Sequence, residues 1–274
     1  MTEPRLAPRS AFAPAALTND DLPLVPQISP GRGVVEFDLP GVYAGTAEYA
    51  EGPTGCTVIH VPKGARTAVD ARGGAVGLSG GYEFHHAIVL AGGSVYGLEA
   101  AAGVNTELLH RAENRTHWAA LAHVSGAVVY DFSTRDTAIH PDAALGRAAL
   151  QNSFEGQVPV GRCGAGRATS VGKIDYDRAE FAGQGAAFGT FGDAKVLVVT
   201  VVVTNVRLTD LALRQFATQV HSSMHRAIQP FHTELDGDTL FALTTDEVEL
   251  TGTAAGLGAL ASELAWDAVL SSVA

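Results

Sequence analysis

The strongest hydrophobic pattern in the chain is the run from Val196 to Leu208, which holds seven valines between Val196 and Val206. β-Branched residues at this density predict buried strand rather than helix. The run is too short for a membrane helix and long for a single strand, since most strands have about 3–10 residues. We therefore expect either one long central strand or two strands joined with nothing between them.

Shorter apolar segments, set off by Gly or Pro, predict further strands. Six of these segments lie before the valine run and one lies after it. The predicted strands are residues 34–38, 42–49, 56–61, 66–70, 87–90, 128–131 and 239–245.

Four helical patterns alternate with these strands. Ser94 is expected to cap the first helix, and Pro141 opens the second. After the valine run, Thr209 or Asp210 caps an amphipathic helix that Pro230 ends. Because the elements interleave without a regular βαβ repeat, a layered α/β sheet–helix architecture is predicted rather than a Rossmann sheet. The predicted helices cover residues 94–112, 141–152, 209–229 and 258–273.

Composition limits the class of protein. The net charge of −11 and the 18 scattered basic residues argue against a nucleic-acid partner. Two cysteines make no disulfide framework and no metal quartet, which predicts a cytoplasmic protein. No apolar run approaches the ~20 residues of a membrane helix, so no membrane partner is expected.

The first 33 residues hold six of the twelve prolines and lack a periodic pattern. They are predicted to form an extended N-terminal arm that wraps a neighbouring subunit, or else a disordered tail. Residues 34–274 are expected to form a single domain.

Two motifs suggest catalysis or metal binding. Residues 77–81 match the G-x-S-x-G nucleophile elbow, which makes a serine hydrolase using Ser79 one alternative, although no helix pattern follows. His221 and His225 have the i, i+4 spacing of zinc ligands, but the first histidine has no Glu beside it and no third ligand is in view. Histidines on a polar helix face are the better interpretation, and no metal or cofactor is predicted.

Three charged residues are further candidates. Lys173 lies beside Ile174 and is predicted to lie in an apolar strand. Such a lysine is either a cation at the edge of the strand or a functional group with a shifted pKa. Asp236 and Asp238 form a turn whose carboxylates are either solvated or placed to orient a nucleophile.

Beyond the arm, nearly the whole chain resembles the 6-aminohexanoate-oligomer (nylon-oligomer) endo-hydrolases, members of the DmpA-like self-processing aminopeptidase family. The runs that carry the resemblance are long. They include EGPTGCTVIHVPKGARTAVDARGGAVGLSGGYEF (51–84), LAGGSVYGLEAAAGV (90–104), GKIDYDR (172–178), TNVRL (204–208) and VHSSMHRAIQPFHTELDGDTLFALTTDE (220–247).

The resemblance implies a layered αββα fold similar to the N-terminal-nucleophile hydrolases. It implies hydrolysis of small amides by a Thr or Ser that self-cleavage frees, in a homo-tetramer without metal. By matching position, Tyr130 would hold the oxyanion, Lys173 would position the nucleophile, and Asp236 and Asp238 would orient it. The substrate cleft would be lined by residues 72–81 and by Gly92, Gly93, Ser94 and Tyr96.

The chain departs from the family inside the valine run. Family members carry a long loop here with an Asn–Thr cleavage site, and this chain has no counterpart near residues 201–202. Thr200 and Thr204 are the remaining candidate nucleophiles, and neither follows an asparagine. A second alternative is therefore a catalytically inactive homologue that keeps the fold, the assembly and the binding of small amides, since loss of a nucleophile typically lowers the rate ~10⁶-fold.

Overall fold

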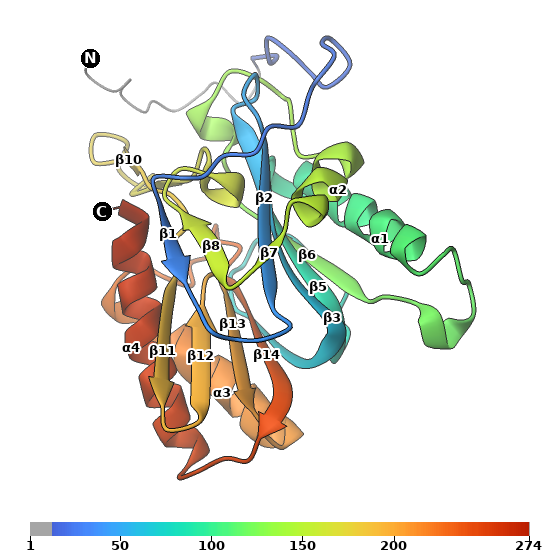
Figure 1. Ribbon diagram of the computed structural model, residues 1–274. Helices are drawn as coiled ribbons and strands as arrows, with labels where there is room; N and C mark the ends of the chain where they lie inside the picture. The colour runs from blue at the N-terminus through green and yellow to red at the C-terminus, as the bar shows by residue number, and fades with distance from the viewer. Residues whose placement is uncertain (1–12, 274) are drawn as a thin grey trace.

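The computed structural model describes residues 13–273 as a four-layered α/β protein, with helices on both outer faces of a folded sheet (Figure 1). Pairs of helices pack together on each face, α1 with α2 and α3 with α4. This is the αββα architecture that the resemblance implies. The helices are α1 Glu99–Arg111, α2 Ala143–Gln151, α3 Asp210–Ser223 and α4 Ala254–Val273.

One ten-stranded sheet supplies both inner layers, in the order β11-β12-β13-β14-β3-β5-β6-β4, with β2 paired to β3 and β7 to β2. Its only parallel pairs in the described part of the chain are β13–β14 and β5–β6. The strands are β1 Gly33–Glu36, β2 Tyr43–Tyr49, β3 Thr54–Ala71, β4 Leu78–Ser79, β5 Phe84–Ala91, β6 Val124–Val128, β7 Phe154–Glu155, β8 Gln157–Val160, β9 Ser170–Val171, β10 Glu180–Phe181, β11 Ala187–Phe191, β12 Ala194–Val198, β13 Val201–Val206 and β14 Thr239–Val248.

Strand β3 joins the two layers. Its first half pairs with β2 and β5, its second half pairs with β14, and its register shifts between His60 and Ala65. The sequence predicted two strands here because the Pro-Lys-Gly segment in the middle resembles a break, whereas the structure uses it as a bulge. The inner core between the layers therefore takes residues from both halves of the sheet, among them Ile59, Ile88, Leu197 and Phe241.

The valine run forms two antiparallel strands, β12 and β13, and not one long strand. Val198 pairs with Val202, so the connection is a tight turn through Val199 and Thr200. Alternate residues face the inner core and the α3/α4 layer, with Leu197 on one side and Val196 on the other. Both faces are apolar because both are covered.

Several predicted boundaries are wrong. Ser94 does not cap α1: it lies within a 3₁₀ turn, Ser94–Leu98, with φ 52°, and no side chain caps that turn. α2 is capped by Asp142, whose carboxylate accepts the Leu145 N–H. Thr209 caps α3 as predicted, but that helix ends at Ser223, before Pro230.

The described part of the arm packs on its own chain. Gln27 exchanges backbone hydrogen bonds with Glu48, and Ala138 donates to the Leu17 carbonyl. Residues 1–12 of the predicted arm lie outside the described residues. Within residues 13–273, no helix is long and apolar enough to cross a membrane.

Candidate active site

Lys173 lies at the centre of the candidate site, in a turn after β9 and not in a strand as predicted. Its side chain is partly buried, and Nζ donates a hydrogen bond to the Tyr130 carbonyl oxygen at 2.8 Å. Burial lowers the pKa of Lys173, while the charges of Asp131 and Asp236 oppose that shift. The amine is therefore closer to losing its proton than an ordinary lysine.

Tyr130 follows β6, two residues beyond the end of the strand. The predicted strand 128–131 is therefore wrong, since β6 ends at Val128 and Tyr130 lies in the connection. The hydroxyl donates to the Ala75 carbonyl at 2.7 Å. Gly237 packs against the ring, because a Cβ at Gly237 would lie 2.9 Å from Tyr130 Cε2.

The two carboxylates predicted in a turn precede β14 and are partly buried and well held. Asp236 Oδ2 accepts from the Thr233 hydroxyl at 2.6 Å, and Asp238 Oδ2 accepts from the His232 backbone N–H at 2.7 Å. The loop is joined to the segment that follows β3, where the Ala75 N–H donates to the Asp236 carbonyl at 2.9 Å. The carboxylates of Asp236 and Asp238 are therefore held by hydrogen bonds and do not lie in a solvated turn.

The glycine segment after β5 meets residues 129–131 at the ends of these two strands, because β5 and β6 are parallel and end together. Gly93 N–H donates to Asp131 Oδ1 at 2.9 Å and Ser94 N–H to the Val129 carbonyl at 3.1 Å. Tyr96 remains exposed. Gly92 must be glycine, since a Cβ there would lie 2.5 Å from Asp131 Oδ2.

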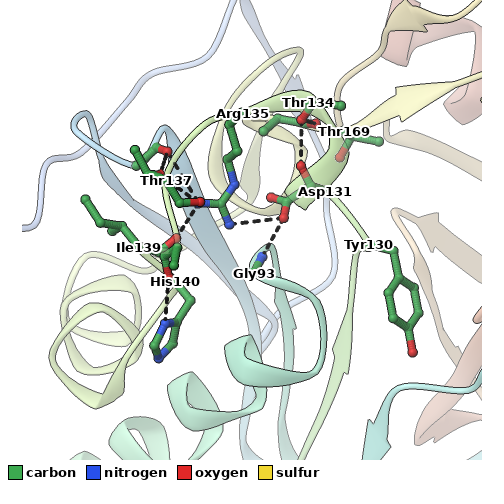
Figure 2. Close-up of polar contacts among 12 residues, drawn as sticks. Gly93, Tyr130, Asp131, Thr134, Arg135, Thr137, Ile139, His140 and Thr169 are labelled. Carbon is green, nitrogen blue, oxygen red and sulfur yellow. Dashed lines mark hydrogen bonds and ion pairs between the residues drawn. The ribbon is translucent and has the colours of Figure 1, made fainter. Parts of the chain in front are cut away.

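Asp131 and Arg135 form a buried ion pair that the sequence did not reveal (Figure 2). Both side chains are 1% exposed and 3.2 Å apart. Tyr130 and Asp131 project to opposite sides of the chain, so one faces the Ala75 carbonyl and the other holds Gly93 (Figure 2). Asp131 and Arg135 flank a short 3₁₀ helix, Phe132–Thr134, and not an α-helix, which is why no pattern indicated the pair.

Of the two candidate threonines, only Thr200 is accessible. It is exposed in the β12–β13 turn, and the pairing of Val201 with Phe241 brings that turn beside the start of β14, just after Asp238. Thr204 is fully buried and its hydroxyl donates to the Lys195 carbonyl at 2.9 Å. A substrate cannot reach Thr204.

Ser79 does not occupy a nucleophile elbow. It ends the two-residue strand β4 and is followed by strand β5, so the helix that an elbow requires is absent at this point. Its hydroxyl accepts the Gly126 N–H at 3.1 Å. The serine-hydrolase alternative therefore lacks its structural basis.

His221 is buried, which corrects the prediction of a polar helix face. Its Nδ1 lies 2.9 Å from Asp70 Oδ2, and burial lowers its pKa. His225 is exposed and lies beyond the end of α3. Across residues 13–273, no group of three or more His, Cys, Asp or Glu is arranged to hold a metal ion.

Taken together, the site has a cationic amine with a lowered pKa, two oriented carboxylates and glycine backbone at the edge of an αββα sheet. Proton transfer and binding of a polarised carbonyl are within reach of these groups. These groups lie on loops that follow β6, β9 and β3 and precede β14 of the αββα fold.

The model for peptidase family S58 matches residues 37–175 and 177–274, and the chain belongs to this family. A 6-aminohexanoate-oligomer endohydrolase from Paenarthrobacter ureafaciens is 50% identical over 332 residues, covering 97% of this chain and 93% of that protein.

Two solved structures share the fold. A Burkholderia sp. β-aminopeptidase has a TM-score of 0.68 at 16% identity, over 90% of this chain and 88% of its own. The L-aminopeptidase D-Ala-esterase/amidase of Ochrobactrum anthropi, described as a variant of the Ntn hydrolase fold, has a TM-score of 0.66 at 16% identity, over 85% and 84%.

The Paenarthrobacter alignment is also longer than this chain. It runs over 332 residues, whereas 97% of 274 residues is about 266, so about 66 aligned positions have no residue here. Since almost the whole chain is aligned, these positions fall inside the matched region.

Proposed function

We propose that this protein hydrolyses amide bonds in 6-aminohexanoate oligomers or similar short linear amides at the site around Lys173. The observation that carries the proposal is the position of the Lys173 amine, hydrogen-bonded beside Tyr130 and within the field of Asp131 and Asp236. An amine with a lowered pKa, next to carboxylates, suits proton transfer to a leaving amine.

Apolar side chains beside the site suit a substrate made of methylene chains. Four of them adjoin site residues in the sequence and are exposed, so they offer apolar surface without closing the site. They are Val95 at 47%, Tyr96 at 63%, Ile174 at 73% and Leu235 at 75% exposure.

In this proposal Lys173 positions the nucleophile, Asp236 and Asp238 orient it, and Tyr130 supports the oxyanion. The hydroxyl of Tyr130 donates to the Ala75 carbonyl in the free protein. The substrate oxygen must therefore replace the Ala75 carbonyl as the acceptor of this hydrogen bond. Thr200 is the proposed nucleophile because it is exposed beside the start of β14. Lacking a free α-amine, its hydroxyl depends on Lys173 as the base.

The test measures release of primary amine from the linear 6-aminohexanoate dimer and trimer. Lys173→Met is expected to lower the rate at least ~10²-fold, with Lys63→Met, at an exposed lysine on β3, as control. Thr200→Val is expected to abolish release, with Thr190→Val, at an exposed threonine on β11, as control. Unchanged rates in Lys173→Met would refute the assignment of the site.

A second candidate function is binding of the same amides without turnover. The tight β12–β13 turn and the roughly 66 aligned positions without a residue in this chain favour it, because the family's cleavage loop would fall at that turn. Amine release separates the two candidates, and the intact mass under denaturing conditions tests self-cleavage. Two shorter chains demonstrate self-cleavage, whereas one species of 28.3 kDa leaves Thr200 as an unprocessed residue.

We also propose a homo-tetramer in the cytoplasm. Exposed large apolar side chains away from the site, such as Trp118 and Phe191, support association of subunits. Two cysteines that are both free and buried support a reducing compartment. Light scattering after size-exclusion chromatography tests the tetramer, and a monomer at micromolar concentration would refute it.

A further inference from the structure

His232 makes two hydrogen bonds to one oxygen of Asp238. Its backbone N–H lies 2.7 Å, and its ring Nδ1 3.0 Å, from Asp238 Oδ2. His232 has φ 61°, a left-handed conformation that a histidine rarely adopts. The backbone turn and the ring thus converge on a single carboxylate oxygen.

The tautomer of the ring follows from its surroundings. An ionised carboxylate only accepts hydrogen bonds, so the nitrogen facing Asp238 must carry a proton. The other nitrogen, Nε2, is buried and has no hydrogen-bond partner among the described residues. A proton there would be unpaired in a buried site, which favours Nδ1 as the nitrogen that carries the proton.

Neighbouring rings fix the orientation of this imidazole. His221 and His225 contact it edge-on, with centroids 4.5 and 4.9 Å away, and Phe231 lies 4.0 Å away. His221 is held by Asp70 at the end of β3.

The same end of β3 closes the arrangement. Arg72 Nε pairs with Asp70 Oδ2 at 2.7 Å, and Arg72 N–H donates to the Asp238 carbonyl at 2.9 Å. Histidine ring, carboxylate and strand end therefore form one closed loop of contacts.

We propose that His232 is a positioning residue that holds the carboxylate of Asp238 in its working orientation through the Nδ1–H bond. This inference rests on the proposed function, in which Asp238 orients the nucleophile. It also gives the histidine cluster a role, since His221 and His225 pack against the ring of His232.

Paired substitutions separate the hydrogen bond from packing. His232→Asn places an amide donor near the position of Nδ1, and Asn tolerates the left-handed backbone. His232→Leu keeps bulk and removes the donor. His110→Asn, at an exposed histidine on α1, is the control.

For amine release from the 6-aminohexanoate dimer, we expect His232→Leu to lower kcat about 10- to 100-fold, the range for a hydrogen bond to a charged group, with KM nearly unchanged. His232→Asn restores most of the loss. Equal rates in the two variants, both folded by circular dichroism, would overturn the proposal. If His232→Leu does not fold, His232→Gly replaces it, because glycine lacks the donor and accepts the left-handed backbone.

A measurement independent of turnover tests the contact itself. In protein with ¹⁵N-labelled histidine, NMR is expected to show a proton on Nδ1 of His232. The Nε2–H form at His232 would overturn the proposal even in an active protein. A protein without turnover refutes the proposed function, and the tautomer then still decides whether His232 holds Asp238.

Discussion

Replacing Arg135 with methionine is expected to destabilise the fold strongly. The guanidinium pairs with Asp131 at 3.2 Å, and both side chains are 1% exposed. It also donates to the carbonyls of Gly52 and Ile139. Methionine fills similar volume but leaves the Asp131 carboxylate buried without its cation.

The magnitude follows from the cost of an uncompensated buried charge. Removing one partner of a buried pair typically costs about 3–5 kcal/mol. At about 2–4 °C per kcal/mol for a domain approaching this size, Tm should fall by about 6–20 °C. Burial lowers the pKa of Arg135, and the charge and hydrogen bond of Asp131 oppose that shift.

A double-mutant cycle isolates the pair. Asp131→Asn retains an acceptor for the Gly93 N–H while removing the charge, so Asp131→Asn/Arg135→Met should be more stable than Arg135→Met alone. Thermal unfolding followed by circular dichroism measures all three variants. A fall of less than about 2 °C for Arg135→Met, or additive effects in the double variant, would refute the reasoning.

Three further predictions concern the core, the site backbone and a buried histidine. Val199→Asp places a charge at a buried turn position and should prevent soluble expression, so normal yield and Tm would show that the turn is not packed as described. Gly73→Ala should disrupt the site, because its Cβ would lie 2.1 Å from the Asp236 carbonyl oxygen; Gly256→Ala in α4 is the control, expected to keep Tm or raise it slightly, and equal Tm and activity in both would contradict the close approach. Burial lowers the pKa of His85 to about 4, so the unfolded chain binds a proton between pH 6.5 and about 4 while the folded protein does not. The free energy of unfolding should therefore decrease as the pH is lowered through that window. Urea unfolding at several pH values should show a weaker pH dependence of this free energy in His85→Leu; an equal pH dependence would assign the acid sensitivity to other groups.

Local pattern sufficed for most strands and for the amphipathic face of α3, because period and β-branching reflect burial directly. It failed where tertiary contacts decide. β3 continues through Pro62 and Gly64 because β5 pairs with it on both sides of that segment, while β14 pairs with its second half. His221 is buried because Asp70, 151 residues earlier, provides a partner that the helix pattern does not show.

The site was predictable in its residue types and not in its geometry. Lys173 contacts the Tyr130 carbonyl and feels the charge of Asp236, across more than 40 residues of sequence. The Asp131–Arg135 pair and the His232–Asp238 contact were missed, since neither spacing has a periodic signature in a loop. Whether these residues carry catalysis stays a prediction.

The most direct test of the central claim is release of amine from the linear 6-aminohexanoate dimer by the purified, intact protein, with Lys173→Met measured in parallel. We predict release by the unmodified protein that falls at least ~10²-fold in Lys173→Met. No release from the unmodified protein, or equal release from both, would contradict an amide-hydrolase site around Lys173.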